Sequence, residues 1–321
     1  MKKNIFLALL SIAAATAAAG QAGSSGESIA IAVAVPRQSD HLNASQLARL
    51  GQKMVDIVAQ SGIAAASGGS EIIMYPELFV EREELVEGGM ENLVVVTADI
   101  SFTIRHMESG KILASASKRA KGAGVNRQKA LSDLISKISA GDEALRTLVA
   151  DGRTKTADYY ADNCRNIALK ATSHAKRHEY RQAIAMLAAI PEAVSCYAHA
   201  QRKLEDIFAD YQAYRCEELL REARSLSAGR FYMKALATLA SIDNFSAQCS
   251  RSVEAMIADI EGKLSEKERQ EWSLLLRQYE DSQKMYLLEA NVKKARLSAI
   301  RDIATAYYSQ KTSLSYNLIV K

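Results

Sequence analysis

Proline and cysteine are scarce in this sequence. It contains 3 prolines and 4 cysteines in 321 residues, and so few prolines argue against long, stiff linkers between domains. No cysteine precedes Cys164, and no Cys-x-x-Cys motif occurs. We therefore expect neither a lipid anchor on a cysteine near the N-terminus nor catalytic redox use of the thiols.

A strong charge and the common catalytic motifs are also absent. The formal charge is +4 at pH 7 without a long basic run, which is not the balance of a nucleic-acid-binding protein. Neither the Gly-x-Ser-x-Gly turn of many hydrolases nor the Asp-Phe-Gly motif of kinases occurs. Acidic residues are numerous, but their helical patterns indicate solvated faces, and no pair can be nominated for acid/base catalysis.

The first residues have the pattern of a secretory signal peptide. Two lysines precede an apolar, alanine-rich run, and small residues follow it, an order typical of exported proteins. We predict a signal peptide over residues 1–22 and a mature chain that is soluble, not a lipoprotein, and located in the periplasm or the outer cell envelope. An uncleaved anchor helix is the alternative, although the run is short for a membrane span of about 20 residues.

Residues 23–140 are predicted to form an α/β domain. An apolar run that ends at Pro36 indicates a buried strand, and a segment with helical periodicity follows it, with Asn43 as the expected N-cap. Three further strands come next: the first contains Pro76, which suggests an edge strand, and residues 93–106 alternate between apolar and polar. With a final amphipathic helix the order is β-α-β-β-β-α, an open sheet backed on one face by two helices.

The segment from Met107 to Ile138 resembles part of a known group of domains. It reads MESGKILASASKRAKGAGVNRQKALSDLISKI, that is, a strand ending in a Ser-Gly turn, a second strand, a Gly-x-Gly bend and an alanine-bearing helix. This arrangement resembles the TolB N-terminal-like and curli-secretion-lipoprotein-like envelope domains. The resemblance implies an envelope domain used for assembly rather than for chemistry. The lipid-attachment cysteine and the membrane-inserting hairpins of the curli-secretion proteins are absent here, which argues against a pore-forming role.

Residues 141–250 have helical periodicity and contain an internal repeat. The segment that begins at Cys164 aligns with the segment that begins at Cys216, 52 residues later, and the pattern Tyr-x-x-Ala-(Ile/Leu)-x-x-Leu-x-x-Ile starts at both Tyr180 and Tyr232. This pattern resembles the second helix of a tetratricopeptide unit, in which a small alanine lets helices approach closely. We predict an all-α, tetratricopeptide-like helical-repeat domain with two repeats and an elongated connecting helix.

Residues 251–321 are predicted to form a long C-terminal helical segment and a short tail. The segment contains the only tryptophan, Trp272. We interpret this residue and four tyrosines as packing residues at helix crossings, with a recognition groove as the alternative. The tyrosines are Tyr159, Tyr160, Tyr307 and Tyr308.

The four cysteines form an even set in a chain predicted to be exported. Cys164 and Cys196 are 32 residues apart, and Cys216 and Cys249 are 33 apart, so each pair would be the same bond in one of the two repeats. Each bond would join the start of one helix to the start of the helix after next. Pairing Cys196 with Cys216 would fail if one helix runs between them, because twenty helical residues span about 30 Å. We predict the first two disulfides, with free thiols as the alternative.

Histidines provide a weak indication of a metal site. His174 and His178 have the i, i+4 spacing of zinc ligands, but Ala-Lys-Arg lies between them and the glutamate of a His-Glu-x-x-His motif is missing. A solvated basic helix end is therefore the preferred interpretation, and no metal is expected. We identify no companion that would make a site with His41, His106 or His199.

The stretch KRAKGAGVNRQKA, which starts at Lys118, invites a phosphate-binding interpretation. A Walker loop needs Lys-Ser/Thr after its last glycine, which is missing here, and Arg127 stands where the dinucleotide-binding motif has its third glycine. We interpret the stretch as a bend between a strand and a helix capped by Asn126. The helix N-terminus could still attract an anion weakly. The weak anion-binding candidates are Lys121, Gly122, Gly124, Arg127 and Lys129.

The sequence thus favours a non-enzymatic, exported envelope protein that acts as a protein-interaction or assembly module without a cofactor. The expected partners are exported or envelope proteins, bound as a peptide or helix in the groove of the repeat domain, and homo-oligomers are left open. One alternative is an accessory factor of an outer-membrane secretion or assembly channel. A second alternative is a phosphate-ligand-binding enzyme that uses the Gly122–Lys129 loop.

Overall fold

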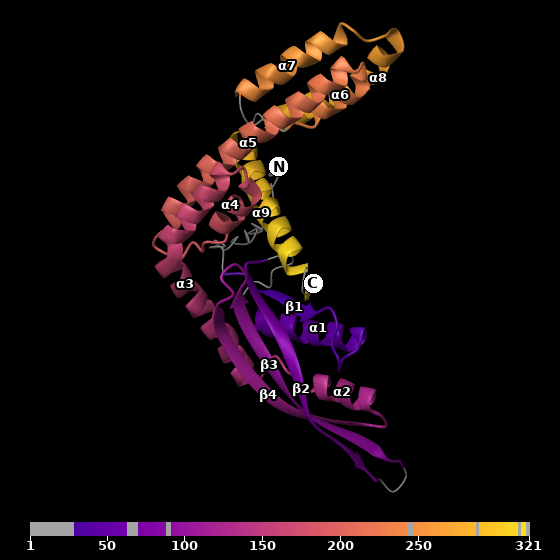
Figure 1. Cartoon of the computed structure of the whole chain (residues 1–321), viewed down its shortest axis with the longest axis vertical. Coiled ribbons are helices and arrows are strands. Elements are labelled where there is room, and N and C mark those ends of the chain that lie inside the picture. Colours follow the sequence, from indigo (N-terminus) through magenta and orange to yellow (C-terminus); the bar gives the residue numbers. More distant parts are fainter. Residues whose placement is uncertain are drawn as a thin grey trace, which may run out of the picture.

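The computed structural model shows an elongated, bent molecule with a β-sheet at one end and a helical arm at the other (Figure 1). The predicted signal peptide, residues 1–22, lies outside the described residues. Among the residues that are described, no helix combines the length and the apolar character needed to cross a membrane. The structure describes residues 29–62, 70–87, 91–242, 247–286, 289–313 and 316–318.

The sheet has five strands in the order β4-β3-β2-β1-β5. Strand β1 is parallel to β2, and the other neighbours are antiparallel. The predicted β-α-β-β-β-α order is present in the first part of the chain, and the predicted mixed α and β class is confirmed. The strands are β1 (Ala32–Pro36), β2 (Ile72–Val86), β3 (Leu93–His106), β4 (Ile112–Gly124) and β5 (Tyr316–Leu318).

Strand β5 comes from the C-terminus, where the sequence predicts only a short tail. It pairs with β1, with Tyr316 opposite Pro36. The ring of Tyr316 lies 5.3 Å from that of Tyr75, and the Arg105 guanidinium lies over both rings. Three residues are too few to show a strand periodicity, so this strand depends on the edge that β1 offers rather than on its own sequence.

Pro76 lies in the half of β2 that has an open edge. The register between β1 and β2 includes only Ile73 and Met74 of β2, so β2 has no β1 partner from Tyr75 onward. Proline lacks the N–H that a central strand would donate, and it is tolerated at such an edge. Strand β2 is therefore internal in the strand order and an edge along most of its length.

Three helices cover one face of the sheet, one more than the sequence predicts. They are α1 (Ala44–Gln60), α2 (Arg127–Ser136) and the beginning of α3 (Glu143–Lys176). Leu145, Leu148 and Val149 of α3 belong to the same apolar core as α1 and α2. A Cβ atom on Gly152 would lie 2.5 Å from Cδ1 of Ile104, so this glycine permits the close approach of α3 to β3. The buried apolar residues of β3 are Val96, Ala98, Ile100, Phe102 and Ile104.

The caps of α1 and α2 follow the sequence. The Asn43 side chain accepts a hydrogen bond from the Gln46 backbone N–H, and the Gln46 side chain accepts one from the Asn43 N–H, which is a complete capping box. At α2, Asn126 Oδ1 accepts from the N–H of Lys129 at 2.9 Å. These local bonds start both helices at the predicted places.

The helical arm repeats a long helix followed by a short one. Helix α3 is followed by α4 (Tyr180–Ala188), and α5 (Tyr197–Ala228) is followed by α6 (Tyr232–Ala240). His178 and Arg230, 52 residues apart, both have φ of 62° in the turn between the two helices. The two pairs therefore share a backbone plan, while their likeness to tetratricopeptide units stays a prediction. The remaining helices are α7 (Ala247–Glu261), α8 (Glu266–Tyr286) and α9 (Glu289–Ser313).

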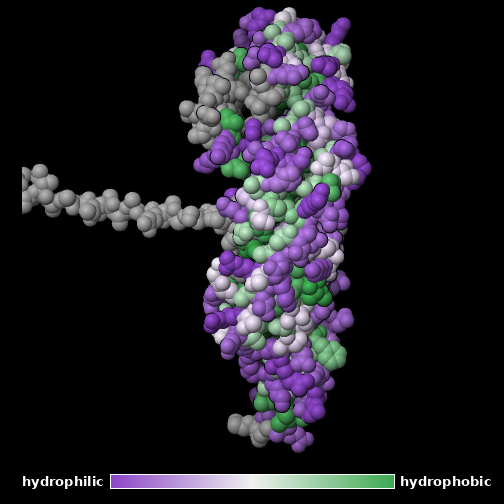
Figure 2. Space-filling view, turned by 90° about the vertical axis from the view of Figure 1, so that its left-hand side faces the viewer, coloured by the Kyte–Doolittle hydropathy of each residue, from purple (hydrophilic) through white to green (hydrophobic). Residues whose placement is uncertain are grey.

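Helix α9 runs back along the arm to the sheet (Figure 1). It packs on α4, and β5 follows it directly and joins the sheet. The face of the molecule on which α3 lies is mainly hydrophilic, with scattered apolar residues (Figure 2). At the far end of the arm, Trp272 is buried in an apolar core and donates a hydrogen bond to Glu261 at 2.6 Å, as expected of a packing residue.

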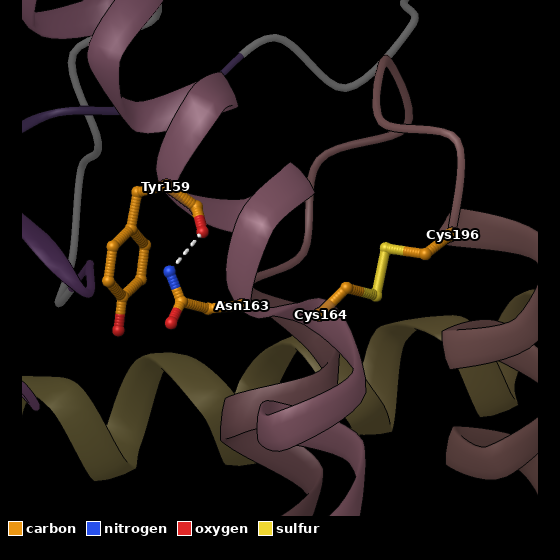
Figure 3. The surroundings of a disulfide bond; sticks show 4 residues. All are labelled: Tyr159, Asn163, Cys164 and Cys196. Atoms are coloured by element: carbon orange, nitrogen blue, oxygen red, sulfur yellow. Dashed lines mark hydrogen bonds between the residues drawn. A yellow bond between two sulfur atoms is a disulfide. The ribbon is translucent and has the colours of Figure 1, made fainter.

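Both predicted disulfides are present. Cys164–Cys196 has a Cα–Cα distance of 6.4 Å, and Cys216–Cys249 has one of 6.2 Å. The prediction that each bond begins at a helix start is wrong for Cys164 and Cys216, which lie well inside α3 and α5. No proline interrupts these helices, so each extends further toward its N-terminus than the repeat pattern indicates. Figure 3 shows the first bond, with Tyr159 and Asn163 just before Cys164 on α3.

Candidate functional site

One acidic and one basic side chain are buried next to each other where the sheet meets the arm. The β2–β3 register places Ile72 opposite His106, which brings Glu71, just before β2, beside the imidazole. Glu71 and His106 are 5 % and 1 % exposed, and Oε1 of Glu71 lies 3.0 Å from Nε2 of His106. The other carboxylate oxygen of Glu71 accepts a hydrogen bond from the Tyr160 hydroxyl. These contacts join β2, β3 and α3.

His106 also takes part in the turn between β3 and β4. Its Nδ1 accepts from the Ser109 N–H at 3.1 Å and lies 3.0 Å from Ser109 Oγ. Hydroxyl, imidazole and carboxylate thus follow one another in the order of a nucleophile, a base and an orienting acid. However, the backbone N–H already uses Nδ1, and Ser109 Oγ accepts from the Lys111 N–H at 3.3 Å. We therefore interpret the Ser109–His106 contact as one that stabilises the turn.

Helix α9 adds a second set of polar contacts, which are partly buried, at the same place. Glu108 accepts hydrogen bonds from the Tyr307 hydroxyl at 2.9 Å and from Lys311. Burial opposes ionisation of Glu108, but the bonds from Lys311 and Tyr307 outweigh it and lower the pKa of this carboxyl. The Tyr160 and Tyr308 rings are buried, and burial together with the nearby Glu71 raises the pKa of both phenols, which stay neutral at ordinary pH.

A cavity of about 360 Å³ lies between the β3–β4 turn and α3. We call it the junction cavity. Glu71, His106, Glu108 and Ser109 line it from the sheet side, and Met186 of α4 lines it from the arm. Helix α3 and the residue that follows it contribute a stripe of side chains with helical spacing: Tyr159, Ile167, Lys170, Ser173 and His174 on the helix, and Arg177 at its C-cap.

A second hollow, of about 340 Å³, lies between α4 and α5. We call it the tyrosine groove, and its aromatic lining residues are His178, Tyr180, Tyr211, Tyr214 and Tyr307. The His178 ring stacks on Tyr214 with centroids 5.0 Å apart and an interplanar angle of 20°. The Tyr307 hydroxyl bonds to Glu108, which lines the junction cavity. The groove and the cavity are therefore neighbours.

Charged side chains also line the tyrosine groove. Arg215 pairs with Glu218 at 3.1 Å, and Glu218 also accepts from the Tyr214 hydroxyl at 2.8 Å. In the part of the chain that the structure describes, Arg181 has no ion pair with an acidic residue. The groove thus combines flat aromatic surface with an available positive charge.

The weak anion-binding candidates around α2 have contacts within the protein. A Cβ atom on Gly122 would lie 2.0 Å from the Ala130 carbonyl oxygen, and one on Gly124 would lie 2.6 Å from Lys129 Cβ. Both glycines therefore allow α2 to pack closely on β4. Arg127 pairs with Glu83 at 3.0 Å. The carbonyl of Lys121 accepts from Lys137 at 2.8 Å, and the Ala123 N–H donates to Asp133 at 3.0 Å. These contacts do not favour the phosphate-binding alternative.

The two histidines with i, i+4 spacing are separated by the end of α3. His174 pairs with Glu179 at 2.6 Å, whereas His178 lies beyond the helix in the left-handed region and stacks on Tyr214. Within the described ranges, no group of three or more His, Cys, Asp or Glu residues could hold a metal ion. The spacing therefore does not bring the two imidazoles to one site.

The sequence offers no companion for His106, but the structure places two residues beside it. Glu71 and Tyr160 are its neighbours in space, although they lie 35 and 54 residues away in the sequence. They meet only through the β2–β3 register and the packing of α3. A glutamate before one strand and a histidine at the end of its antiparallel neighbour is the one sequence signal that could indicate this pair.

Comparisons with known proteins are sparse. No protein-family model and no curated protein matches the sequence. One solved structure, a minor lipoprotein from Acinetobacter baumannii, is 14% identical with a TM-score of 0.26, over 38% of this chain and 92% of that chain. Another, a candidate lipoprotein from Caulobacter crescentus, is 15% identical with a TM-score of 0.25, over 40% and 91%. Such TM-scores support no functional assignment, and neither neighbour supports the prediction that this chain is not a lipoprotein.

Proposed function

We propose that this protein is a non-enzymatic, exported interaction module of the cell envelope that binds a segment of a partner protein in the tyrosine groove. The groove itself is the observation that carries the proposal, because tyrosine and arginine are the residues that dominate protein-binding surfaces. Four tyrosines and a histidine offer large, flat contact areas that lose little conformational entropy on binding. The export part of the proposal is supported by the two disulfides, which persist in oxidising compartments.

The walls of the groove are well supported. Tyr180 and Tyr211 pack against the apolar core of the first helix pair, and the Cys164–Cys196 bond joins α3 to the start of α5. A preformed surface of this kind reduces the entropy that binding must overcome. Because Arg181 lacks an acidic partner among the described residues, we expect the bound segment to be amphipathic and to place a carboxylate beside it.

Photocrosslinking in the producing cell tests this function. A photoreactive amino acid at Gln182, which lines the groove, is compared with the same amino acid at Lys234, the equivalent position 52 residues later. We expect a discrete crosslinked partner from position 182 alone, and its loss when Arg181→Glu or Tyr214→Ala is added. Identical products from both positions, or products that survive Arg181→Glu, would contradict the proposal.

A further inference from the structure

We propose that the junction cavity binds a small anion, a carboxylate or phosphate monoester carried on a compact, flat apolar body. This site is distinct from the tyrosine groove and does not depend on the function proposed for the groove. Its volume of about 360 Å³ is that of a small-molecule site, and junctions between structural units are common places for such sites.

The charge balance of the cavity favours an anion. Both of its acidic residues are engaged inside the protein, Glu71 by Tyr160 and His106 and Glu108 by Lys311 and Tyr307. On the opposite wall, Lys170 has no ion pair or hydrogen bond among the described residues. A lysine ammonium that faces a cavity without a counter-ion attracts a carboxylate or phosphate.

Arg177 and His174 extend this basic wall. Arg177 donates to Ser173 Oγ and to Glu179, each at 2.8 Å, and Glu179 also pairs with His174. These contacts fix the guanidinium at the rim of the cavity and leave further N–H groups for a ligand, since a guanidinium has five. Three carboxylates nearby, those of Glu71, Glu108 and Glu179, would repel an extended polyanion, so the site suits a ligand with one small anionic group.

The other walls suit a flat apolar body. The Tyr159 ring packs on the His106 ring with centroids 4.3 Å apart, and Ile167 and Met186 line the same cavity. The His106 imidazole is buried, and its Nε2 lies 3.0 Å from Glu71 Oε1. With this nitrogen facing Glu71, the histidine adds flat ring surface to the cavity rather than a free donor.

The second helix pair shows that the fold does not require this basic wall. At the equivalent positions 52 residues later, Glu222 replaces Lys170 and Gly229 replaces Arg177. The two pairs nevertheless share the same helix-to-helix turn and a disulfide each. The cations are therefore a property of the junction rather than of the repeat.

The test is an NMR titration of the full mature chain with selectively labelled methionine and isoleucine methyl groups, which reports on Met186 and Ile167. The probes are benzoate and phenyl phosphate, and benzamide serves as the neutral isostere. We expect saturable shifts of both methyl signals with either or both anions, at a dissociation constant of about 1 mM or below, and much weaker binding of benzamide. Which anion binds more tightly distinguishes a carboxylate source from a phosphate source.

Two lysine variants make the test specific. Lys170→Ala should weaken anion binding roughly tenfold, as expected for a lost charge-assisted hydrogen bond. Lys176→Ala is the matched control, because Lys176 is also exposed on α3 but does not line the cavity, and it should leave binding unchanged. The proposal is overturned by the absence of saturable shifts with both anions, by equal binding of benzamide, or by equal losses in the two lysine variants.

Discussion

The helix pair α3–α4 and the helix pair α5–α6 repeat one backbone plan with two different sets of side chains. Each pair has a left-handed residue in its turn, at His178 and at Arg230, and each is joined to a later helix by a disulfide. Equivalent tyrosines, at 180 and 232, begin the short helices. What the two pairs share is therefore the set of residues that builds the fold.

One difference between the pairs lies on the side of the first pair that meets the sheet. Tyr160, which donates to the buried Glu71, has Gln212 as its counterpart in the second pair. The first pair also contacts α9 through α4 and lies beside both the cavity and the groove. Internal repeats allow the two copies to be compared, because a residue that is present in only one copy is not needed for the backbone that both copies share. The cavity proposed above as a ligand site is lined by the first pair, and the proposed groove lies between the first pair and α5.

The largest expected effect comes from breaking the buried contact that joins the first pair to the sheet. Glu71→Ala leaves the Tyr160 hydroxyl and His106 without their partner. Because buried polar groups without partners are costly, we expect a loss of about 3 kcal/mol in the free energy of unfolding. Urea unfolding followed by circular dichroism measures it. Glu205→Ala, at an exposed position on α5, is the control and should change stability by less than about 0.5 kcal/mol.

A double-mutant cycle sharpens this result. Tyr160→Phe alone removes one end of the same hydrogen bond, so its effect should not add to that of Glu71→Ala, and we expect a coupling of about 1 kcal/mol. Additive losses would mean that the two residues stabilise the junction independently. In that case the hydrogen bond between them would not be what joins the first pair to the sheet.

Much of the fold was accessible from the sequence because it depends on local patterns. Alternation along residues 93–106 predicts β3, the 52-residue offset predicts the recurring helix pairs, and the cysteine spacing predicts both disulfides. Strand β5 and the third covering helix were not accessible. Strand β5 is too short to show a period. The apolar residues by which α3 covers the sheet run on into the repeat within one continuous helix, so the sequence does not mark them as a separate helix.

The candidate site was less accessible, for a different physical reason. Glu71, His106 and Lys170 are each unremarkable in their own segments and are brought together by strand register and helix packing. The sequence directs attention instead to Gly122 and Gly124, whose spacing resembles a phosphate loop. Those glycines are explained by the closeness of α2 to β4. Local motifs therefore indicated packing here, while the buried polar cluster needed the tertiary structure.

A smaller effect on stability is expected from removing the contacts between helix α9 and Glu108, which lies in the turn between β3 and β4. The pKa of Glu108 is lowered in the folded protein from its ordinary value of 4.5. The ionised carboxylate therefore stabilises the fold fully at pH values above 4.5. That contribution is lost as the pH falls through the lowered pKa. Relative to Glu108→Gln, the wild type should be more stable by about 1.5 kcal/mol near neutral pH, and the difference should shrink toward zero in acid.

Urea unfolding of both proteins between neutral pH and acid measures this difference, and titrations common to both proteins cancel. Lys311→Met removes the cation that bonds to Glu108 and should flatten most of the pH dependence. A difference that stays constant from neutral pH into acid would show that Glu108 does not hold α9 through its charge. Helix α9 would then be held in place by its packing on α4 and by β5.

The smallest expected effect on stability comes from glycine substitutions in the two equivalent turns, which distinguish the contribution of the backbone from that of the side chain. A non-glycine residue in the left-handed region costs about 1 kcal/mol, so Arg230→Gly should stabilise the protein by up to that amount. His178→Gly relieves the same strain but removes the stack on Tyr214, which is worth about 1 kcal/mol for aromatic pairs, so its net effect should be near zero. Thermal unfolding of the two variants side by side measures the difference. If both variants stabilise equally, the His178 ring contributes nothing to the groove, and the two turns differ in sequence only.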